Sequence, residues 1–187
     1  MKQKQLSPAG DNWRELPPRD FKGSPFDRIG SGWMLITAGA GGDWNTMTAS
    51  WGGLGVLWRK DVAFAFIRPS RRTFEFANGS ELFTLSFFDE SRRDALNFIG
   101  SNSGRDCDKA AKTGLTPLVF GSGIAGGRGA GAIGFEEACD IIVCRKLYTH
   151  DIDPRQFLDA PLIEKVYNDK DYHRMYIGEI LTVLARQ

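Results

Sequence analysis

Apolar residues along the chain gather in short runs that are rich in β-branched and aromatic residues and are bounded by glycine or charged residues. Four runs follow one another in the first half: WMLITAG from Trp33, NTMTASWGG from Asn45, DVAFAFIR from Asp61 and ELFTLSFF from Glu81. Residues of this kind favour strands. Two longer runs of similar composition, EEACDIIVCRKLYTH and DYHRMYIGEILTVLA, come late in the chain. The pattern predicts a mainly β protein.

Two short helices are expected between these groups of strands. The segment DESRRDALNFIG begins at Asp89, a good N-cap, and ends at Gly100. The segment RDCDKAAKTG offers Asp106 as the expected N-cap and Gly114 as the residue that ends the helix. Alternating strands and helices, which a doubly wound sheet needs, are missing. We therefore expect an antiparallel barrel or sandwich with short helical inserts.

The first 28 residues differ from the rest. Pro17-Pro18 and Ser24-Pro25 oppose helix formation, and no hydrophobic period is visible. We expect residues 1–28 to form an extended N-terminal arm that wraps either a neighbouring molecule or the barrel surface, and residues 29–187 to form one domain.

Composition and net charge argue against nucleic acid, a membrane or a metal ion as the main binding partner. The 187 residues suit one domain, and 24 Lys+Arg against 23 Asp+Glu leave a net charge of +1. Nothing in this overall charge attracts nucleic acid or an anionic membrane, so an anion site has to be local. No apolar run has the length of a membrane span or of a signal-peptide core, and we expect a soluble, cytoplasmic protein. Three unclustered cysteines and two histidines favour neither a disulfide framework nor a metal site.

The stretch RPSRRTFEF places three arginines directly after an apolar strand. On that strand Val62, Phe64, Phe66 and Arg68 share one face. Ser70 can act as N-cap of a helix from Arg71 to Asn78 that ends at Gly79, and Thr73 adds a hydroxyl on the same side. Free amides at a helix start, with Arg68 and Arg71, make a possible phosphate site. An ordinary capped helix with solvated arginines explains the stretch equally well.

Two further segments bear on this choice. Read as a strand, NTMTASW lines one face with the hydroxyls of Thr46, Thr48 and Ser50, which suits a polar planar ligand, although a half-buried strand with a wet face is a common alternative. The segment SNSGRDCDK leads into a helix with Arg105 and Lys109 on one face, and by itself is better explained as a solvated surface.

The sequence shows no motif of side chains that would catalyse a reaction without a cofactor. GSGIAG and GAGAIG, between Gly121 and Gly134, match the dinucleotide fingerprint, but a strand-like run rather than a helix follows them, so we interpret the segment as a loop. No nucleophile elbow or pair of catalytic carboxylates is visible. If the protein is an enzyme, a bound cofactor is expected to supply the chemistry.

Taken in order, LITAG, NTMTASWGGLG, RPSR-x-T, FTLSFF, SGRD-x-DK and YHRMYIGEI resemble the flavin reductase-like family that includes flavoredoxins. The resemblance runs from about Ser24 to Leu184. It implies an FMN-binding split β-barrel, built as a homodimer, that binds FMN and passes electrons between NAD(P)H or another donor and an acceptor.

The resemblance also implies roles for particular residues. The segment Thr46, Met47, Thr48, Ala49, Ser50 and Trp51 would line the flavin ring and ribityl chain, while Arg68, Ser70, Arg71 and Thr73 would hold the phosphate. Ser103, Gly104, Arg105, Asp106 and Lys109 would lie near the polar end of the cofactor. His173 would lie near the flavin and help to seat the nicotinamide, although simple packing at the dimer interface is a competing explanation. Arg72 departs from the family, whose members usually carry an aromatic residue there.

Three functions follow from these expectations. The first is an FMN-dependent oxidoreductase of flavin reductase type that takes electrons from NAD(P)H. The second is a non-catalytic flavin electron carrier, of flavoredoxin type, that is reduced by a protein partner. The third, a dimeric scaffold that has lost its flavin, is disfavoured because every expected contact residue is present.

Overall fold

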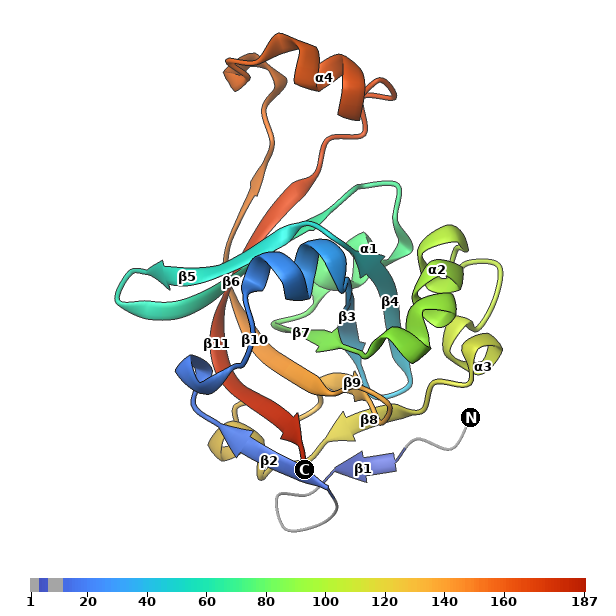
Figure 1. Ribbon diagram of the computed structural model, residues 1–187, viewed down its shortest axis with the longest axis vertical. Helices are drawn as coiled ribbons and strands as arrows, with labels where there is room; N and C mark the ends of the chain where they lie inside the picture. Colours follow the sequence, from blue (N-terminus) through green and yellow to red (C-terminus); the bar gives the residue numbers. More distant parts are fainter. Residues whose placement is uncertain (1–3, 7–11) are drawn as a thin grey trace.

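The computed structural model describes residues 4–6 and 12–187 (Figure 1). Its strands are β1 Lys4–Leu6, β2 Trp13–Leu16, β3 Met34–Ala40, β4 Asp43–Ala49, β5 Gly52–Leu57, β6 Lys60–Ile67, β7 Leu82–Phe87, β8 Pro117–Phe120, β9 Ile133–Phe135, β10 Asp140–Asp151 and β11 Arg174–Arg186. The α-helices are α1 Arg72–Gly79, α2 Arg93–Ser101, α3 Lys109–Thr113 and α4 Ala160–Val166. Short helical turns of other kinds are η1 Pro18–Asp20, η2 Phe26–Ser31, η3 Glu90–Arg92, η4 Ile124–Gly127 and η5 Pro154–Gln156.

One large antiparallel sheet forms the body of the molecule. Its strands run in the order β4-β3-β7-β10-β11-β6-β5, and β2 pairs with the far end of β11. A smaller sheet, β1-β8-β9, lies at the base, and its β1–β8 pair is parallel. The expected mainly antiparallel β architecture with short helical inserts is confirmed, and it is consistent with a split barrel.

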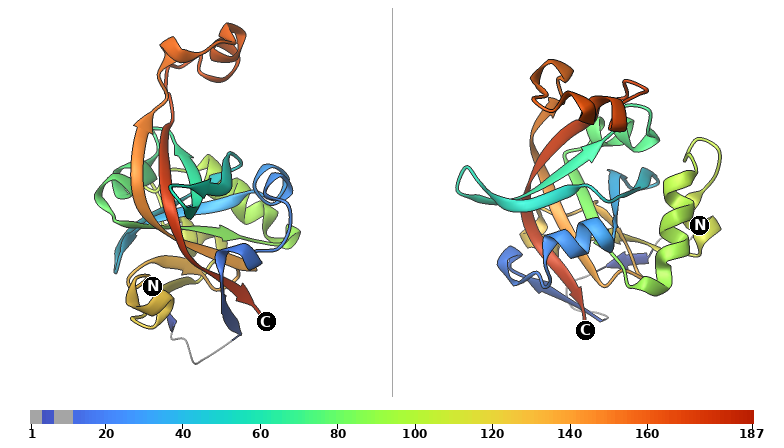
Figure 2. Two further views of the ribbon diagram at one scale, coloured as in Figure 1. Left: turned by 90° about the vertical axis from the view of Figure 1, so that its left-hand side faces the viewer. Right: turned by 45° about the horizontal axis from the view of Figure 1, so that its top comes forward.

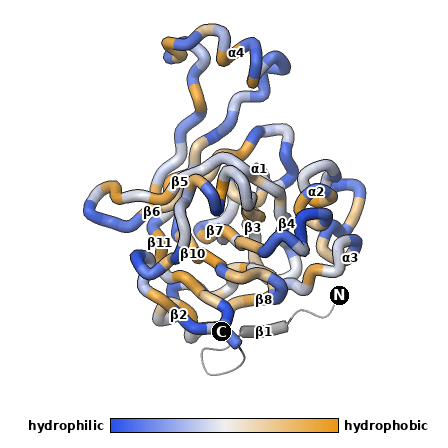
Figure 3. The backbone as a smooth tube through the Cα atoms, in the orientation of Figure 1, coloured by the Kyte–Doolittle hydropathy of each residue, from blue (hydrophilic) through white to orange (hydrophobic). Residues whose placement is uncertain are grey.

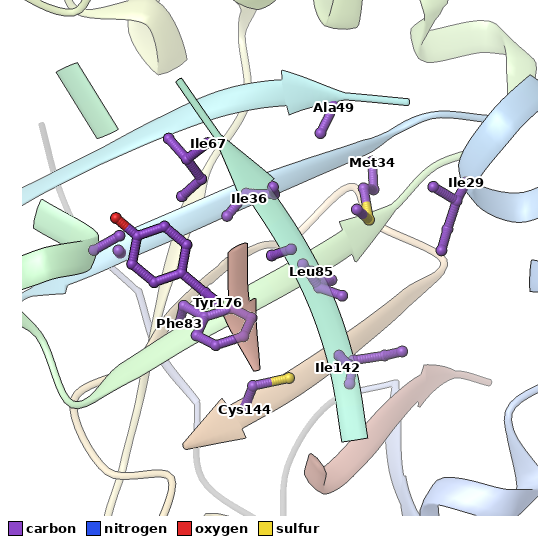
Figure 4. Packing of buried hydrophobic residues seen from close by; sticks show 14 of the residues in the cluster. Ile29, Met34, Ile36, Ala49, Ile67, Phe83, Leu85, Ile142, Cys144 and Tyr176 are labelled. Carbon is purple, nitrogen blue, oxygen red and sulfur yellow. The ribbon is translucent and has the colours of Figure 1, made fainter. Parts of the chain in front are cut away.

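The core explains why several apolar runs lack alternation. Successive residues of β3 and β10 point to two separate hydrophobic clusters, so both faces of these strands are buried. Met34, Ile36, Ile142 and Cys144 belong to the cluster inside the barrel, which Figure 4 shows. Leu35, Ile141 and Val143 belong to the cluster that packs under α2, α3, β8 and β9.

Figures 1 and 2 show that the segment between β10 and β11 projects from the barrel and carries α4. This projecting segment, residues 152–173, is largely hydrophilic (Figure 3). The sequence analysis assigns no element between the two late strand-like runs, so α4 was not predicted. The return of the segment toward β11 brings its last residues back to the barrel beside the end of β6.

Several local predictions need correction. Within the extended arm predicted for residues 1–28, residues 12–28 contain two helical turns, η1 and the start of η2, besides the strand β2, which pairs with this chain's own β11. NTMTASWGG is not one strand, because β4 ends at Ala49 and β5 begins at Gly52. The N-cap of α3 is Asp108 and not the predicted Asp106, because the Asp108 carboxylate accepts a hydrogen bond from the amide of Ala111. Part of the predicted arm, residues 1–3 and 7–11, lies outside the described residues.

Other local predictions are confirmed. Asp89 accepts from the amide of Ser91 at the start of η3, which leads into α2, and Gly114 ends α3 in the left-handed conformation. The glycine-rich segment connects antiparallel β8 and β9 through the short turn η4, and no α-helix follows it. Since the dinucleotide fingerprint needs a strand before it and a helix after it, that interpretation is excluded here.

No helix among residues 4–6 and 12–187 is long and apolar enough to cross a membrane. Within the same ranges, no group of three or more His, Cys, Asp or Glu residues is arranged to hold a metal ion.

Candidate functional site

A cavity of about 220 Å³ opens at the end of β4. It gathers most of the residues proposed for the flavin ring and two of those proposed for the phosphate, together with Phe66 and His173. Its lining residues are Met47, Thr48, Ala49, Ser50, Trp51, Phe66, Arg68, Arg71 and His173. We call it the β4 cavity.

Its position follows from the sheet order. Within the described part of the chain, β4 is an edge strand that pairs only with β3, so alternate backbone amides and carbonyls on its outer side lack a strand partner there. Trp51, in the bend after the strand, is half exposed at 46%, and its ring centroid lies 5.0 Å from that of His173. The cavity thus combines backbone hydrogen-bonding groups with aromatic surface, which suits a planar polar ligand.

Two of the three hydroxyl groups in the predicted row form hydrogen bonds within the protein. Thr46 is buried, and its Oγ1 lies 2.9 Å from Oγ1 of Thr37. Thr48 donates to the carbonyl oxygen of Leu96 at 2.6 Å and so ties β4 to α2. Among the three hydroxyl residues, Ser50 is the one for which the described contacts include no hydrogen bond of the side chain.

Two of the residues predicted to hold the phosphate, Arg68 and Ser70, already have aspartate partners. Arg68 donates to both carboxylate oxygens of Asp169, at 2.9 and 3.2 Å, and to the carbonyl oxygen of Val166. The Ser70 hydroxyl donates to Asp171 rather than capping a helix, because α1 begins only at Arg72 and Arg71 occupies its N-cap. The prediction that Ser70 is the N-cap is therefore wrong.

Thr73 lies on the inner side of α1. It is fully buried, and its hydroxyl accepts from the side-chain amide of Asn45 at 2.7 Å. The Thr73 hydroxyl therefore links α1 to β4 and does not line the β4 cavity.

Arg71 also lines the cavity but does not join these carboxylate pairs. It donates to the carbonyl oxygen of Gly100 at 2.8 Å, and no carboxylate within residues 12–187 forms an ion pair with it. Its positive charge is therefore balanced by no neighbouring side chain and remains available to an anion.

The residues of SGRD-x-DK lie on the other side of α1. Arg105 pairs with Glu75 and donates to the carbonyl oxygen of Ser70 at 3.3 Å. Ser103 accepts from the amide of Arg105, and Asp106 donates its amide to the Ser103 carbonyl. This turn therefore packs against α1, and Ser103, Arg105 and Asp106 do not line the β4 cavity.

Gly104 and Lys109 line a second cavity, of about 520 Å³, together with Trp44, Asn45 and Thr46. Lys109 is buried, and its ammonium group donates to the carbonyl oxygen of Ile99 at 3.1 Å. Burial, reinforced by the charge of Arg71, lowers the pKa of Lys109 to about 8. Residues of β4 line both cavities, Asn45 and Thr46 the second one and Met47 to Ala49 the β4 cavity.

His173 is buried beside Arg68 at the start of β11. Burial, with a smaller effect from Arg68, lowers its pKa to about 4. Its Nδ1 lies 2.9 Å from the hydroxyl of Tyr167. The imidazole is therefore neutral at physiological pH and cannot serve as a cation for a phosphate.

Sequence reasoning missed the residues that come from the projecting segment. Tyr167, Asp169 and Asp171 lie about 100 positions after Arg68 and Ser70, yet they contact them directly. Nothing local in the sequence marks this pairing. Arg72, the departure from the family pattern, pairs with Glu75 at 3.4 Å and lies over Phe76, outside the β4 cavity.

Comparison with known proteins agrees with the fold and the motifs. Residues 26–187 match the family model described as flavin reductase like domain. An FMN-binding domain of a flavin reductase-like enzyme from Shewanella baltica aligns with a TM-score of 0.65 at 15% identity, covering 94% of this chain and 78% of that one.

Two other solved structures are similar. The flavoredoxin of Desulfovibrio vulgaris aligns with a TM-score of 0.61 at 20% identity, covering 83% of this chain and 69% of that one. An NADH:FAD oxidoreductase of Streptomyces globisporus, in complex with NAD and FAD fragments, aligns with a TM-score of 0.57 at 13% identity, covering 83% of this chain and 75% of that one. No curated protein matches the chain.

Proposed function

Because the chain belongs to the flavin reductase like domain family, we propose that it binds FMN in the β4 cavity and transfers electrons from NAD(P)H through this cofactor to an acceptor. The observation that carries the proposal is the convergence of Met47–Trp51, Arg71 and His173 on one cavity at the free edge of β4. The FMN-binding and flavoredoxin neighbours support the same cofactor.

The residues present fit a flavin in two respects. The outer edge of β4 and the Trp51 ring suit a planar ring with several hydrogen-bonding atoms. Arg71 supplies a positive charge that has no carboxylate partner within the described part of the chain. A phosphate is therefore expected at Arg71, and Arg68 can join it only if Asp169 releases the guanidinium.

The size of the cavity indicates how much of the cofactor one subunit holds. At about 220 Å³ it is smaller than the usual ligand pocket of about 300 to 1,000 Å³. Trp51 stands half exposed at its mouth. We therefore propose that a second copy of the chain completes the site, as a homodimer.

When bound, the flavin would accept a hydride from the nicotinamide and pass electrons on, so the protein needs no acid–base pair of its own. The work of the chain is to bind and to orient. Backbone groups of Met47 to Ser50 would hold the ring edge, Arg71 would fix the phosphate, and the neutral His173 would offer a hydrogen bond without adding charge.

The test is to reconstitute the purified protein with FMN and to add NADH or NADPH under anaerobic conditions. Loss of the flavin's visible absorbance at a catalytic rate is the expected result. A protein that binds FMN but responds to neither nucleotide would instead be the flavin electron carrier, which the flavoredoxin neighbour makes the second candidate. A protein that binds no FMN would contradict both.

A further inference from the structure

Tyr167 is the one residue of the projecting segment that contacts the imidazole of the β4 cavity through a hydrogen bond of its side chain. It follows α4 directly and is buried, with 5% of its surface exposed. Its hydroxyl lies 2.9 Å from Nδ1 of His173, and the two rings meet edge to face with centroids 5.6 Å apart. A buried tyrosine hydroxyl with a single well-placed partner is a specific arrangement rather than general packing.

The position of Tyr167 is itself fixed. Arg68 lies over its ring at 5.3 Å and donates to the carbonyl oxygen of the preceding residue, Val166. Phe157 and Tyr172 pack against the ring from the projecting segment. The hydroxyl therefore cannot turn away from His173 without moving the whole end of this segment.

The direction of the hydrogen bond follows from the available protons. Burial keeps both groups neutral, since it raises the pKa of Tyr167 and lowers that of His173 to about 4. The charged groups facing the imidazole are Arg68, Arg71, Asp169 and Asp171, two of each sign. A neutral phenol hydroxyl is a better donor than acceptor, and an unprotonated imidazole nitrogen is the stronger acceptor of the two groups, so the Tyr167 proton is directed to Nδ1 across the 2.9 Å contact.

We propose that Tyr167 is a positioning residue: its hydroxyl donates to Nδ1 of His173, fixes the imidazole as the tautomer that carries its proton on Nε2, and so makes His173 a neutral hydrogen-bond donor in the wall of the β4 cavity. A donor of this kind matches a carbonyl oxygen or an unprotonated ring nitrogen of a planar ligand. The ligand part of this inference rests on the proposed function.

The direct test is ¹⁵N NMR of the protein labelled at histidine. The chain has only His150 and His173, so a His150→Gln variant assigns both rings. In the wild type at pH 7, Nδ1 of His173 is expected to be unprotonated and Nε2 protonated. A proton on Nδ1 would overturn the proposal whether or not any flavin binds.

Two variants test whether the Tyr167 hydroxyl acts on the imidazole of His173. Tyr167→Phe keeps the ring and removes the donor, so the Nδ1 resonance should move toward that of a free acceptor nitrogen and the pKa of His173 should rise. Tyr172→Phe is the matched control: it removes a hydroxyl from a ring that also packs on Tyr167 and should change neither quantity. An unchanged His173 spectrum in a folded Tyr167→Phe protein would contradict the proposal.

FMN titrations then separate this inference from the proposed function. Tyr167→Phe should weaken FMN binding about 5-fold, the effect of one neutral hydrogen bond. In a His173→Ala background it should add less than about a 2-fold effect, because Tyr167 acts through His173. Equal, independent losses in both backgrounds would overturn the positioning role. Failure of the wild type to bind FMN would overturn the proposed function, and the NMR result would still decide the tautomer.

Discussion

At the scale of single residues, the structure distinguishes arginines that look alike in the sequence. Arg68 and Arg105 already have carboxylate partners in Asp169 and Glu75, and Arg72 pairs with the same Glu75. Among residues 4–6 and 12–187, the Arg71 guanidinium has only the carbonyl oxygen of Gly100 as a partner. The charge of Arg71 is therefore the one that a bound phosphate would not have to share.

Arg71→Ala should accordingly weaken FMN binding by about 10-fold or more, because a hydrogen bond to a charged group contributes about 1.5 to 3 kcal/mol. Arg72→Ala is the matched control, since it removes a neighbouring positive charge that lies outside the β4 cavity. The measurement is a flavin fluorescence titration at fixed ionic strength. Equal losses in the two variants would mean that only the general positive field matters.

His173 should make stability depend on pH in a defined window. Its pKa is about 4 in the folded protein, against an ordinary value of about 6.5, so the unfolded chain binds more protons between these values. Stability is therefore present above about pH 6.5 and is lost as the pH falls toward 4. Urea unfolding at several pH values should show this slope, and His173→Gln should flatten it.

Acidic groups affect stability at lower pH than His173 does, so the two effects can be distinguished. Glu179, held by Arg145, Lys60 and Arg128, has its pKa lowered to about 2, so its contribution is lost only as the pH falls from about 4.5 toward 2. A wild-type slope between pH 6.5 and 4 that His173→Gln leaves unchanged would contradict the burial of a neutral imidazole.

At the scale of elements, local sequence signals served well where the partner is close along the chain. The strands β3, β4, β6 and β7 were found from their β-branched and aromatic runs, and Asp89 and Gly114 were recognised as helix boundaries. Ser70 was misassigned because a serine after a proline is a good N-cap, yet Asp171 competes for its hydroxyl. That competition depends on a contact across about 100 residues, which no local pattern reveals.

The turn of Ser103 to Asp106 shows how elements are held around the site. A Cβ added at Gly104 would lie 2.0 Å from the side-chain oxygen of Asn45, whose amide donates to Thr73 in α1. Gly104→Ala should therefore push Asn45 away from α1 and destabilise the fold by about 1 to 3 kcal/mol. Denaturant unfolding measures this loss.

Gly79→Ala is the matched control, because nothing lies within 4 Å of a Cβ at the end of α1. It should be neutral or slightly stabilising. If both variants lost the same stability, close packing at Gly104 would not be the reason for the glycine.

At the scale of the whole molecule, the sequence was sufficient for the fold class and the family. The six motifs in order predicted the flavin reductase-like family, and the family model matches residues 26–187. The projecting segment could not be predicted in the same way, because α4 has only seven residues and buries none of them, so its sequence shows no helical period of core positions. Its contribution to the site, through Tyr167 and Asp169, became visible only in three dimensions.

The proposed homodimer needs exposed apolar surface that the second copy of the chain can cover. Leu158 is fully exposed on the projecting segment, and Trp58 and Phe26 are 55% and 88% exposed. Sedimentation equilibrium should give twice the chain mass of 20.8 kDa at micromolar concentration. A single-chain mass throughout would contradict the dimer and would leave the small β4 cavity as the whole site.

The placement of the flavin is the central claim, and a crystal structure of the protein grown or soaked with FMN tests it most directly. The account predicts flavin density along the outer edge of Met47–Ala49, with the phosphate within hydrogen-bonding distance of Arg71 and the ring near Trp51 and His173. Density confined to the second cavity, between Trp44 and Lys109, would contradict it.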